Sequence, residues 1–206
     1  MSLTLFCNKK MSEQLHIITP LVKSEQLTAA LASTAHPVYL KLENLQPSGS
    51  FKIRGIGATC ADAKTTRGAT KIVGSSGGNA GMAMAYAARK LGMSAQLFIP
   101  TSTPTFMVEK IKEEGATVVV GGSNWNEANQ AASECLEKDP TAAFVHPYDQ
   151  ETTWQGHSTI VDEIKAQLEQ AGAHEPPAAI VTVVGGGGLA AGILAGMQRQ
   201  AFFSAV

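Results

Sequence analysis

The feature that most constrains the fold of this chain is an alternation of short β-rich runs with longer helical stretches. Several of the runs are nearly continuous in Val, Ile and Leu, as parallel strands buried on both faces are. We expect six strands, at residues 38–43, 71–76, 94–100, 117–122, 143–147 and 179–184.

Helical stretches fill most of the intervals between these runs. Gly92 stands where a helix over residues 77–91 would end, and Gly115 ends a second helix over 105–114. The remaining stretches predict helices at residues 126–138, 152–170 and 188–200. Strand, helix and strand in regular succession predict an α/β fold, in which helices cover both faces of a parallel sheet.

Composition argues against several classes of function. The 206 residues, 44% of them hydrophobic, suffice for one large or two small domains. A net charge of −1 without basic clusters offers no surface for nucleic acid or a membrane. Three scattered cysteines, Cys7, Cys60 and Cys135, form neither a disulfide framework nor a metal site. We expect a cytoplasmic protein without a metal, and an unstructured extension at residues 1–10.

A lysine follows the first expected strand, at the point where a helix would open. The segment PSGSFK, residues 47–52, places Lys52 there among small residues and one aromatic. Its amine becomes nucleophilic if partial burial or the positive end of a helix lowers the lysine pKa. The competing interpretation is a solvated lysine in a first helical turn.

A second motif, SSGGNAG at residues 75–81, lies between the expected strand 71–76 and its helix. Exposed backbone amides at the start of a helix, with hydroxyl and carboxamide donors beside them, would bind a carboxylate. The alternative is a tight turn that Ser and Asn cap.

A third motif is the run of four glycines Gly185, Gly186, Gly187 and Gly188, again between a strand and a helix. Without a Cβ, successive amides can form a nest for a phosphate. The run is not a dinucleotide fingerprint, because no G-x-G-x-x-G with a downstream acid is present. A flexible turn would explain one or two glycines, so four favour anion binding.

All three motifs stand after strands, and in open parallel sheets ligands bind beyond the carboxyl ends of the strands. Together they describe a reactive lysine, a site for a carboxylate and a site for a phosphate. An aldehyde cofactor that carries a phosphate, acting on an amino acid, satisfies all three.

The segment KLENLQPSGSFKIRG, residues 41–55, resembles the cofactor-lysine segment of fold-type II pyridoxal-phosphate (PLP) enzymes, which have the tryptophan synthase β-like fold. The loop SSGGNAG is more similar to serine/threonine dehydratases than to cysteine synthases, whose loop typically reads TSGNTG. The four glycines resemble the cofactor-phosphate loop of the family, and WQGH at residues 154–157 also looks familial. The resemblance covers about residues 11–200.

The resemblance implies a role for each motif. Lys52 would form the Schiff base with PLP and move the substrate Cα proton, and Phe51 would lie against one face of the pyridine ring. Asn79 would bind the 3′-hydroxyl of the ring. Backbone amides of Gly185, Gly186, Gly187 and Gly188 would hold the phosphate. The substrate carboxylate would lie among Ser75, Ser76, Gly77 and Ala80.

The reaction that the resemblance implies is elimination of the β-hydroxyl of L-serine or L-threonine, giving pyruvate or 2-oxobutanoate and ammonia. PLP would delocalise the carbanion at Cα, and a protonated hydroxyl would leave. Family members of full length are homodimers, and a monovalent cation such as K⁺ accompanies some. Another fold-type II activity, such as β-replacement or racemisation, is the alternative enzyme reading.

The resemblance also implies two domains. A small α/β domain at residues 44–148 would be inserted into a large PLP domain at residues 11–43 and 149–206. Family members continue beyond the helix that follows the four glycines, with the partner of the pyridine nitrogen, the second ring wall and most cation ligands. We therefore expect a shortened form with an incomplete large domain and little dehydratase activity. A non-enzymatic fragment that pairs with full-length subunits is the alternative.

Other conspicuous residues suggest structural roles. His146 and His157 have no Cys or carboxylate at metal-ligand spacing, so we interpret them as satisfied structural histidines. Cys60 and Cys135 lie in helical stretches and are interpreted as small packing groups. For Arg54, two residues after the lysine, the sequence leaves two roles open: orienting the small domain, or a solvated side chain.

Overall fold

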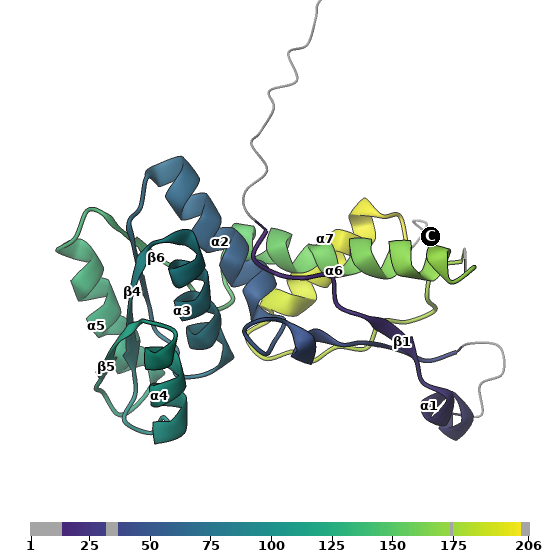
Figure 1. Cartoon of the computed structure of the whole chain (residues 1–206), viewed down its shortest axis with the longest axis horizontal. Coiled ribbons are helices and arrows are strands. Elements are labelled where there is room, and N and C mark those ends of the chain that lie inside the picture. The colour runs from purple at the N-terminus through teal and green to yellow at the C-terminus, as the bar shows by residue number, and fades with distance from the viewer. Residues whose placement is uncertain (1–13, 32–36, 174, 203–206) are drawn as a thin grey trace, which may run out of the picture.

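The computed structural model describes residues 14–31, 37–173 and 175–202, so the expected extension at residues 1–10 lies outside the described part. Figure 1 shows two lobes. One holds a four-stranded sheet with helices α3, α4 and α5, and the other holds α6, α7, β1 and α1. Helix α2, Lys52–Arg67, runs between the lobes.

The larger sheet is parallel throughout. Its strands follow the order β5-β4-β3-β6, with bounds β3 Lys71–Gly74, β4 Ser94–Ile99, β5 Thr117–Val120 and β6 Ala142–Phe144. Strand β3 lies between β4 and β6, so its Ile72 is beside Ala95 of β4 and Ala143 of β6. Strands β3 and β4 are largely buried, whereas β5 is an edge strand with Val119 and Val120 exposed.

Helices cover both faces of this sheet, as the alternation of strands and helices predicts. The helices are α3 Asn79–Leu91, α4 Thr105–Glu113 and α5 Trp125–Glu137. Ile72 and Leu97 pack with α2, α3 and α4 in the main core, whereas the neighbouring Val73 and Phe98 pack on Ala128 and Ala132 of α5. Successive side chains of a strand point to opposite faces, so each strand contributes to two layers.

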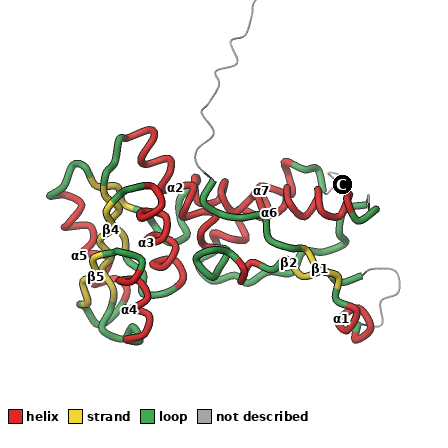
Figure 2. Tube along the Cα trace, viewed as in Figure 1, coloured by secondary structure: helices red, strands yellow, loops and turns green. Residues whose placement is uncertain are grey.

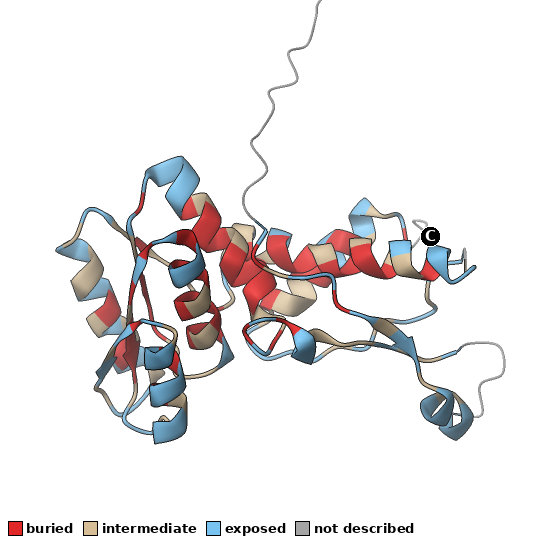
Figure 3. Cartoon of the chain, in the orientation of Figure 1, coloured by how far each residue is buried: buried red, intermediate tan, exposed pale blue. Residues whose placement is uncertain are grey.

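The second lobe is built on two long helices. These are α6 Glu151–Gln170 and α7 Gly188–Arg199, which bury an apolar cluster that includes Val161, Ile164 and Ile193. Beside them lies a small antiparallel pair, β1 Leu21–Lys23 with β2 Tyr39–Lys41, joined through α1 Glu25–Ala30, and the short 3₁₀ helix η1 Glu43–Leu45 follows. Figure 3 shows the buried residues concentrated where α2 meets α6.

Two sequence predictions are wrong in this lobe. Residues 179–184 pair with no strand in the described part of the chain, and Figure 2 draws them as loop. Val181 is 95% exposed there, because a run of β-branched residues forms a strand only where a neighbour accepts its hydrogen bonds. The other correction concerns β2, whose partner is antiparallel to it rather than parallel.

Helix α2 packs very closely on α6, through glycines on both. A Cβ added to Gly55 would lie 2.6 Å from the carbonyl oxygen of Thr153, and one added to Gly156 would lie 2.3 Å from the carbonyl oxygen of Arg54. Helix α7 approaches α6 in the same way at Gly192 and Gly196. None of the helices in the described residues is long and apolar enough to cross a membrane.

We predict that Gly156→Ala destabilises the fold by roughly 1–3 kcal/mol or more, the typical cost of overpacking, because the atoms it meets are backbone that cannot turn aside. Gly121→Ala is the matched control, since a Cβ there meets nothing within 4 Å. Urea unfolding followed by circular dichroism measures both. Equal stability of the two variants would contradict the close helix contact.

Candidate active site

Lys52 is the first residue of α2, and its amine lies between the two lobes. The Nζ atom donates to the carbonyl oxygen of Pro147 at 2.6 Å. The side chain is half-buried, and burial lowers its pKa below the ordinary value of 10.5. A lower pKa increases the fraction of neutral amine, which is the nucleophilic form. The solvated lysine of the competing interpretation is therefore not observed.

Two aromatic rings flank this amine. Nζ of Lys52 is 5.5 Å from the ring centroid of Phe51 and 6.0 Å from that of Tyr148. Phe51 in turn meets the ring of His157 edge-on, with 5.3 Å between the centroids. The lysine thus ends in a partly apolar setting with one backbone oxygen as its polar contact.

The loop of four glycines packs against Tyr148, whose ring lies near the Lys52 amine. A Cβ on Gly186 would lie 2.4 Å from the Tyr148 ring, and one on Gly188 would lie 2.5 Å from the Tyr148 carbonyl oxygen. Gly187 has a φ of +86° and precedes α7, a conformation that favours glycine. Lys52 and the glycine loop therefore contact the same two residues, Pro147 and Tyr148.

The second motif begins at the carboxyl end of β3, which neighbours the carboxyl end of β6. Ser75 is fully buried, and its Oγ has no hydrogen-bond partner in the structure. The carbonyl oxygen of Ser75 accepts from Nε1 of Trp125 at 2.8 Å. The ring of Trp125 meets His146 at 5.9 Å, and His146 meets Tyr148 at 4.6 Å, so an aromatic row leads from this loop to the lysine.

The other residues of this motif line the start of α3. Ser76 and Gly77 are partly buried, Ala80 is buried, and Asn79 is exposed as the first residue of the helix. The Ser76 hydroxyl accepts from the Gly78 amide at 3.4 Å, so the segment does form a tight turn. The predicted Ser and Asn caps are not observed, because the N-cap of α3 is Gly78 and no side chain caps this helix. The Ser75 hydroxyl has no partner among the described residues and can receive a ligand.

These residues fit a phosphate-bearing aldehyde in three respects. An amine with a lowered pKa is available at Lys52. Gly185 and Gly187 have open space where a Cβ would stand, so a ligand can approach their backbone. The Ser75 hydroxyl is a buried polar group that lacks a partner, and such groups require an explanation.

Pro147, Tyr148 and Trp154 are residues of this site to which sequence reasoning assigned no role. Trp154 donates from Nε1 to the Tyr148 carbonyl at 2.8 Å and so fixes the turn after β6. The sequence did carry a signal for Pro147 and Tyr148, because both follow the strand β6, whose carboxyl end neighbours that of β3.

His157 differs from the sequence interpretation in one respect. It is structural and fully buried, but neither ring nitrogen has a hydrogen-bond partner among the residues that the structure describes, so it is not a satisfied histidine there. Burial lowers its pKa to about 3, and the nearby charges of Lys52 and Arg54 act in the same direction. His157 is therefore neutral at physiological pH.

Residues 13–203 match the model of a protein family described as pyridoxal-phosphate dependent enzyme. The match covers most of the chain and includes the lysine and all three motifs. The chain belongs to this family.

The family contains relatives with high identity. L-serine dehydratase of Dictyostelium discoideum is 43% identical over 93% of this chain and 56% of the relative. The serine dehydratase-like protein of Homo sapiens is 46% identical over 90% of this chain and 53% of the relative. The chain spans about half the length of the curated relatives it matches.

Solved structures agree on the fold. An L-serine ammonia-lyase from the fungus Rhizomucor miehei matches with a TM-score of 0.83 and 40% identity, over 92% of this chain and 58% of that one. A threonine deaminase isoform from Solanum lycopersicum matches with a TM-score of 0.79 and 29% identity, over 90% of this chain and 48% of that one. The predicted α/β class of fold-type II PLP enzymes is confirmed.

We predict that His157 makes stability depend on pH. Its pKa in the fold, about 3, lies below the 6.5 of the unfolded chain, so the unfolded state binds more protons in between. Stability is therefore full above pH 6.5 and falls as the pH drops toward 3. Between pH 7 and 5 the His157 share of this loss is about 2 kcal/mol, from 1.36 kcal/mol per pKa unit.

Urea unfolding gives the free energy of unfolding of the chain and of His157→Gln at pH 7 and at pH 5. The contribution of His157 is the loss in the unchanged chain minus the loss in the variant. An equal loss in both proteins would contradict a neutral, buried His157.

Proposed function

We propose that this chain is the cofactor-lysine part of a PLP-dependent ammonia-lyase that acts on L-serine or L-threonine. The observation that carries the proposal is the half-buried amine of Lys52, which lies between two aromatic rings and contacts the same turn as the four-glycine loop. The names of the relatives support the same reaction, with serine in the dehydratases and the ammonia-lyase and threonine in the deaminase. The products would be pyruvate or 2-oxobutanoate, with ammonia.

Lys52 would bind the cofactor and afterwards move a proton. When bound, PLP supplies an electron sink that acidifies the Cα–H of an amino acid. The Lys52 amine would then accept that proton at Nζ, and its lowered pKa keeps part of it neutral for this task. Pro147 would orient the amine through its carbonyl oxygen.

The remaining residues would bind and orient. Backbone amides of the loop Gly185, Gly186, Gly187 and Gly188 would hold the phosphate, because two of these glycines leave open space and the other two pack on Tyr148. Phe51 would face the cofactor ring, and Asn79 would donate to its 3′-hydroxyl. The free Ser75 hydroxyl, with Ser76, Gly77 and Ala80, would receive the substrate carboxylate.

We also propose the domain division at residues 44–148, which the compact sheet lobe supports. We further propose that the whole enzyme is cytoplasmic, which the scattered cysteines favour. It would be a homodimer, as the resemblance implies, and K⁺ would be an accessory cation of the full-length family.

We predict that the purified chain, mixed with PLP, shows the absorbance band of lysine-bound cofactor and that Lys52→Ala lacks the band. Lys64→Ala is the control, because this lysine lies on the same helix but donates to the Leu91 carbonyl instead. Formation of pyruvate from serine is measured in the same samples. A band that persists in Lys52→Ala would contradict the role of this lysine.

A band without pyruvate would favour the non-enzymatic fragment, and use of sulfide with serine would favour β-replacement.

We predict that Gly185→Ala weakens PLP binding by roughly tenfold or more, the factor that 1.4 kcal/mol represents, while the free energy of unfolding stays nearly unchanged. A Cβ at Gly185 meets no atom of the chain within 4 Å, so only a ligand would meet it. Titration of PLP and of inorganic phosphate measures the affinity, with Gly121→Ala as the control. Unchanged affinity in Gly185→Ala would contradict a phosphate site at this loop.

A further inference from the structure

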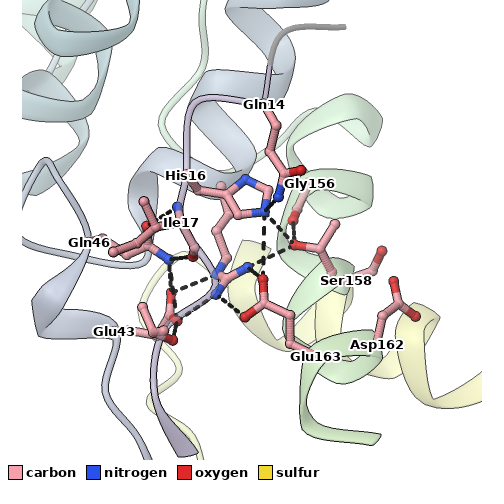
Figure 4. A network of polar contacts seen from close by, with 12 residues as sticks. Gln14, His16, Ile17, Glu43, Gln46, Gly156, Ser158, Asp162 and Glu163 are labelled. Atoms are coloured by element: carbon pink, nitrogen blue, oxygen red, sulfur yellow. Dashed lines mark hydrogen bonds and ion pairs between the residues drawn. The ribbon is translucent and has the colours of Figure 1, made fainter. Parts of the chain in front are cut away.

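Arg54 is fully buried in the first turn of α2, and every N–H of its guanidinium group has an acceptor. Nε and Nη2 donate to the two oxygens of Glu43 at 2.7 Å each. Nη1 and Nη2 donate to the two oxygens of Glu163 at 2.6 and 2.8 Å, and Nη1 also donates to Oγ1 of Thr159 at 3.1 Å. These are two forked ion pairs that share one cation, and Figure 4 shows the network around them.

A second cation completes the network. Nζ of Lys41 contacts Glu163 at 2.6 Å, the Thr19 carbonyl at 2.7 Å and Oε1 of Gln167 at 2.8 Å. Two cations thus face two carboxylates, and the buried charges balance. Burial alone would raise the pKa of Glu43 and lower that of Lys41. The hydrogen bonds from Arg54 and Thr19 outweigh burial for Glu43, so the pKa of this carboxyl lies below its ordinary value.

The partners of Arg54 come from two different elements. Glu43 opens η1, just before the PSGSFK segment, and Glu163 lies in the middle of α6. Arg54 itself is two residues after Lys52, and its backbone amide donates to the Phe51 carbonyl at 3.0 Å. The forks therefore fix the turn that carries Phe51 and Lys52 against the lobe of α6.

With all five donors engaged, Arg54 has none left for a substrate carboxylate or a phosphate. A buried ion pair is also a poor source of stability, because desolvation of the charges offsets their attraction. What a planar fork adds over an apolar contact is direction, since its N–H groups donate to both oxygens of a carboxylate in a fixed geometry.

We propose that Arg54 is the positioning residue of the site: its two forked ion pairs set the orientation of the α2 turn from which Lys52 reaches the cofactor. This inference rests on the proposed function for its purpose. It also resolves the two roles that the sequence left open for Arg54 in favour of orientation, because the side chain is not solvated.

The test compares Arg54→Lys with Lys41→Met, under conditions in which urea unfolding shows both variants fully folded. Arg54→Lys keeps the charge but loses the fork on α2, whereas Lys41→Met disturbs the same network from β2. The first measurement is the rate at which trace acetic anhydride labels Lys52 at a series of pH values, read by mass spectrometry. It reports the pKa and accessibility of this amine and needs no cofactor.

We expect Arg54→Lys to raise the pKa of Lys52 toward 10.5, because a loosened turn admits water to an amine whose pKa burial lowers. Lys41→Met should leave the labelling of Lys52 unchanged. The second measurement is the rate at which the absorbance of lysine-bound cofactor appears after PLP is added, which Arg54→Lys should slow by roughly 100-fold, the cost in rate of a small misplacement of a reacting group.

Equal effects of the two variants on Lys52 labelling would overturn the proposal and leave Arg54 a merely structural residue. Should Arg54→Lys not fold, Glu43→Gln takes its place, because it removes the charge of one fork partner and keeps its size. Absence of PLP binding by the unchanged chain would count against the proposed function, whereas the labelling result would still decide the role of Arg54.

Discussion

Helices α2 and α7 both approach α6 at glycines, and the position of Lys52 depends on that approach. Gly55 meets α6 at Thr153 and His157, and Gly192 meets His157 from the side of α7. The His157 ring is enclosed there without a hydrogen-bond partner and supports the ring of Phe51 beside the lysine. Larger side chains at either glycine would separate the helices and move the first turn of α2.

Electrostatics then acts on this rigid frame. The forks between Arg54, Glu43 and Glu163 fix the direction of the turn, while partial burial keeps the Lys52 amine a weaker base than in water. Within the described residues the Lys52 amine has one hydrogen-bond partner, the Pro147 carbonyl oxygen, and no carboxylate there raises its pKa. Packing and ion pairs thus both fix the position of the Lys52 amine at the junction of the two lobes.

Local sequence was sufficient to predict the parallel strands, because they are short apolar runs that alternate with helices. It did not give their order, in which β6 pairs with β3 rather than with β5. It was not sufficient for residues 179–184, where a strand pattern lacks a partner in the described residues, nor for β1, which has three residues and is mostly exposed. The lysine and the glycine motifs were predicted from their places between expected strands and helices, but the four glycines follow no strand in the described residues, so for them the premise was wrong. The contacts of Tyr148 with Gly186 and of Arg54 with Glu163 join residues that are far apart in the sequence. Local spacing therefore does not predict them.

The central claim is that Lys52 is the residue that meets the cofactor, and chemical trapping tests it most directly. The 206-residue chain is incubated with PLP, reduced with borohydride to make the link permanent, digested and mapped by mass spectrometry. We expect a single modified peptide, the one that contains Lys52. Modification spread over surface lysines, with Lys52 no more labelled than Lys64 on the same helix, would contradict it.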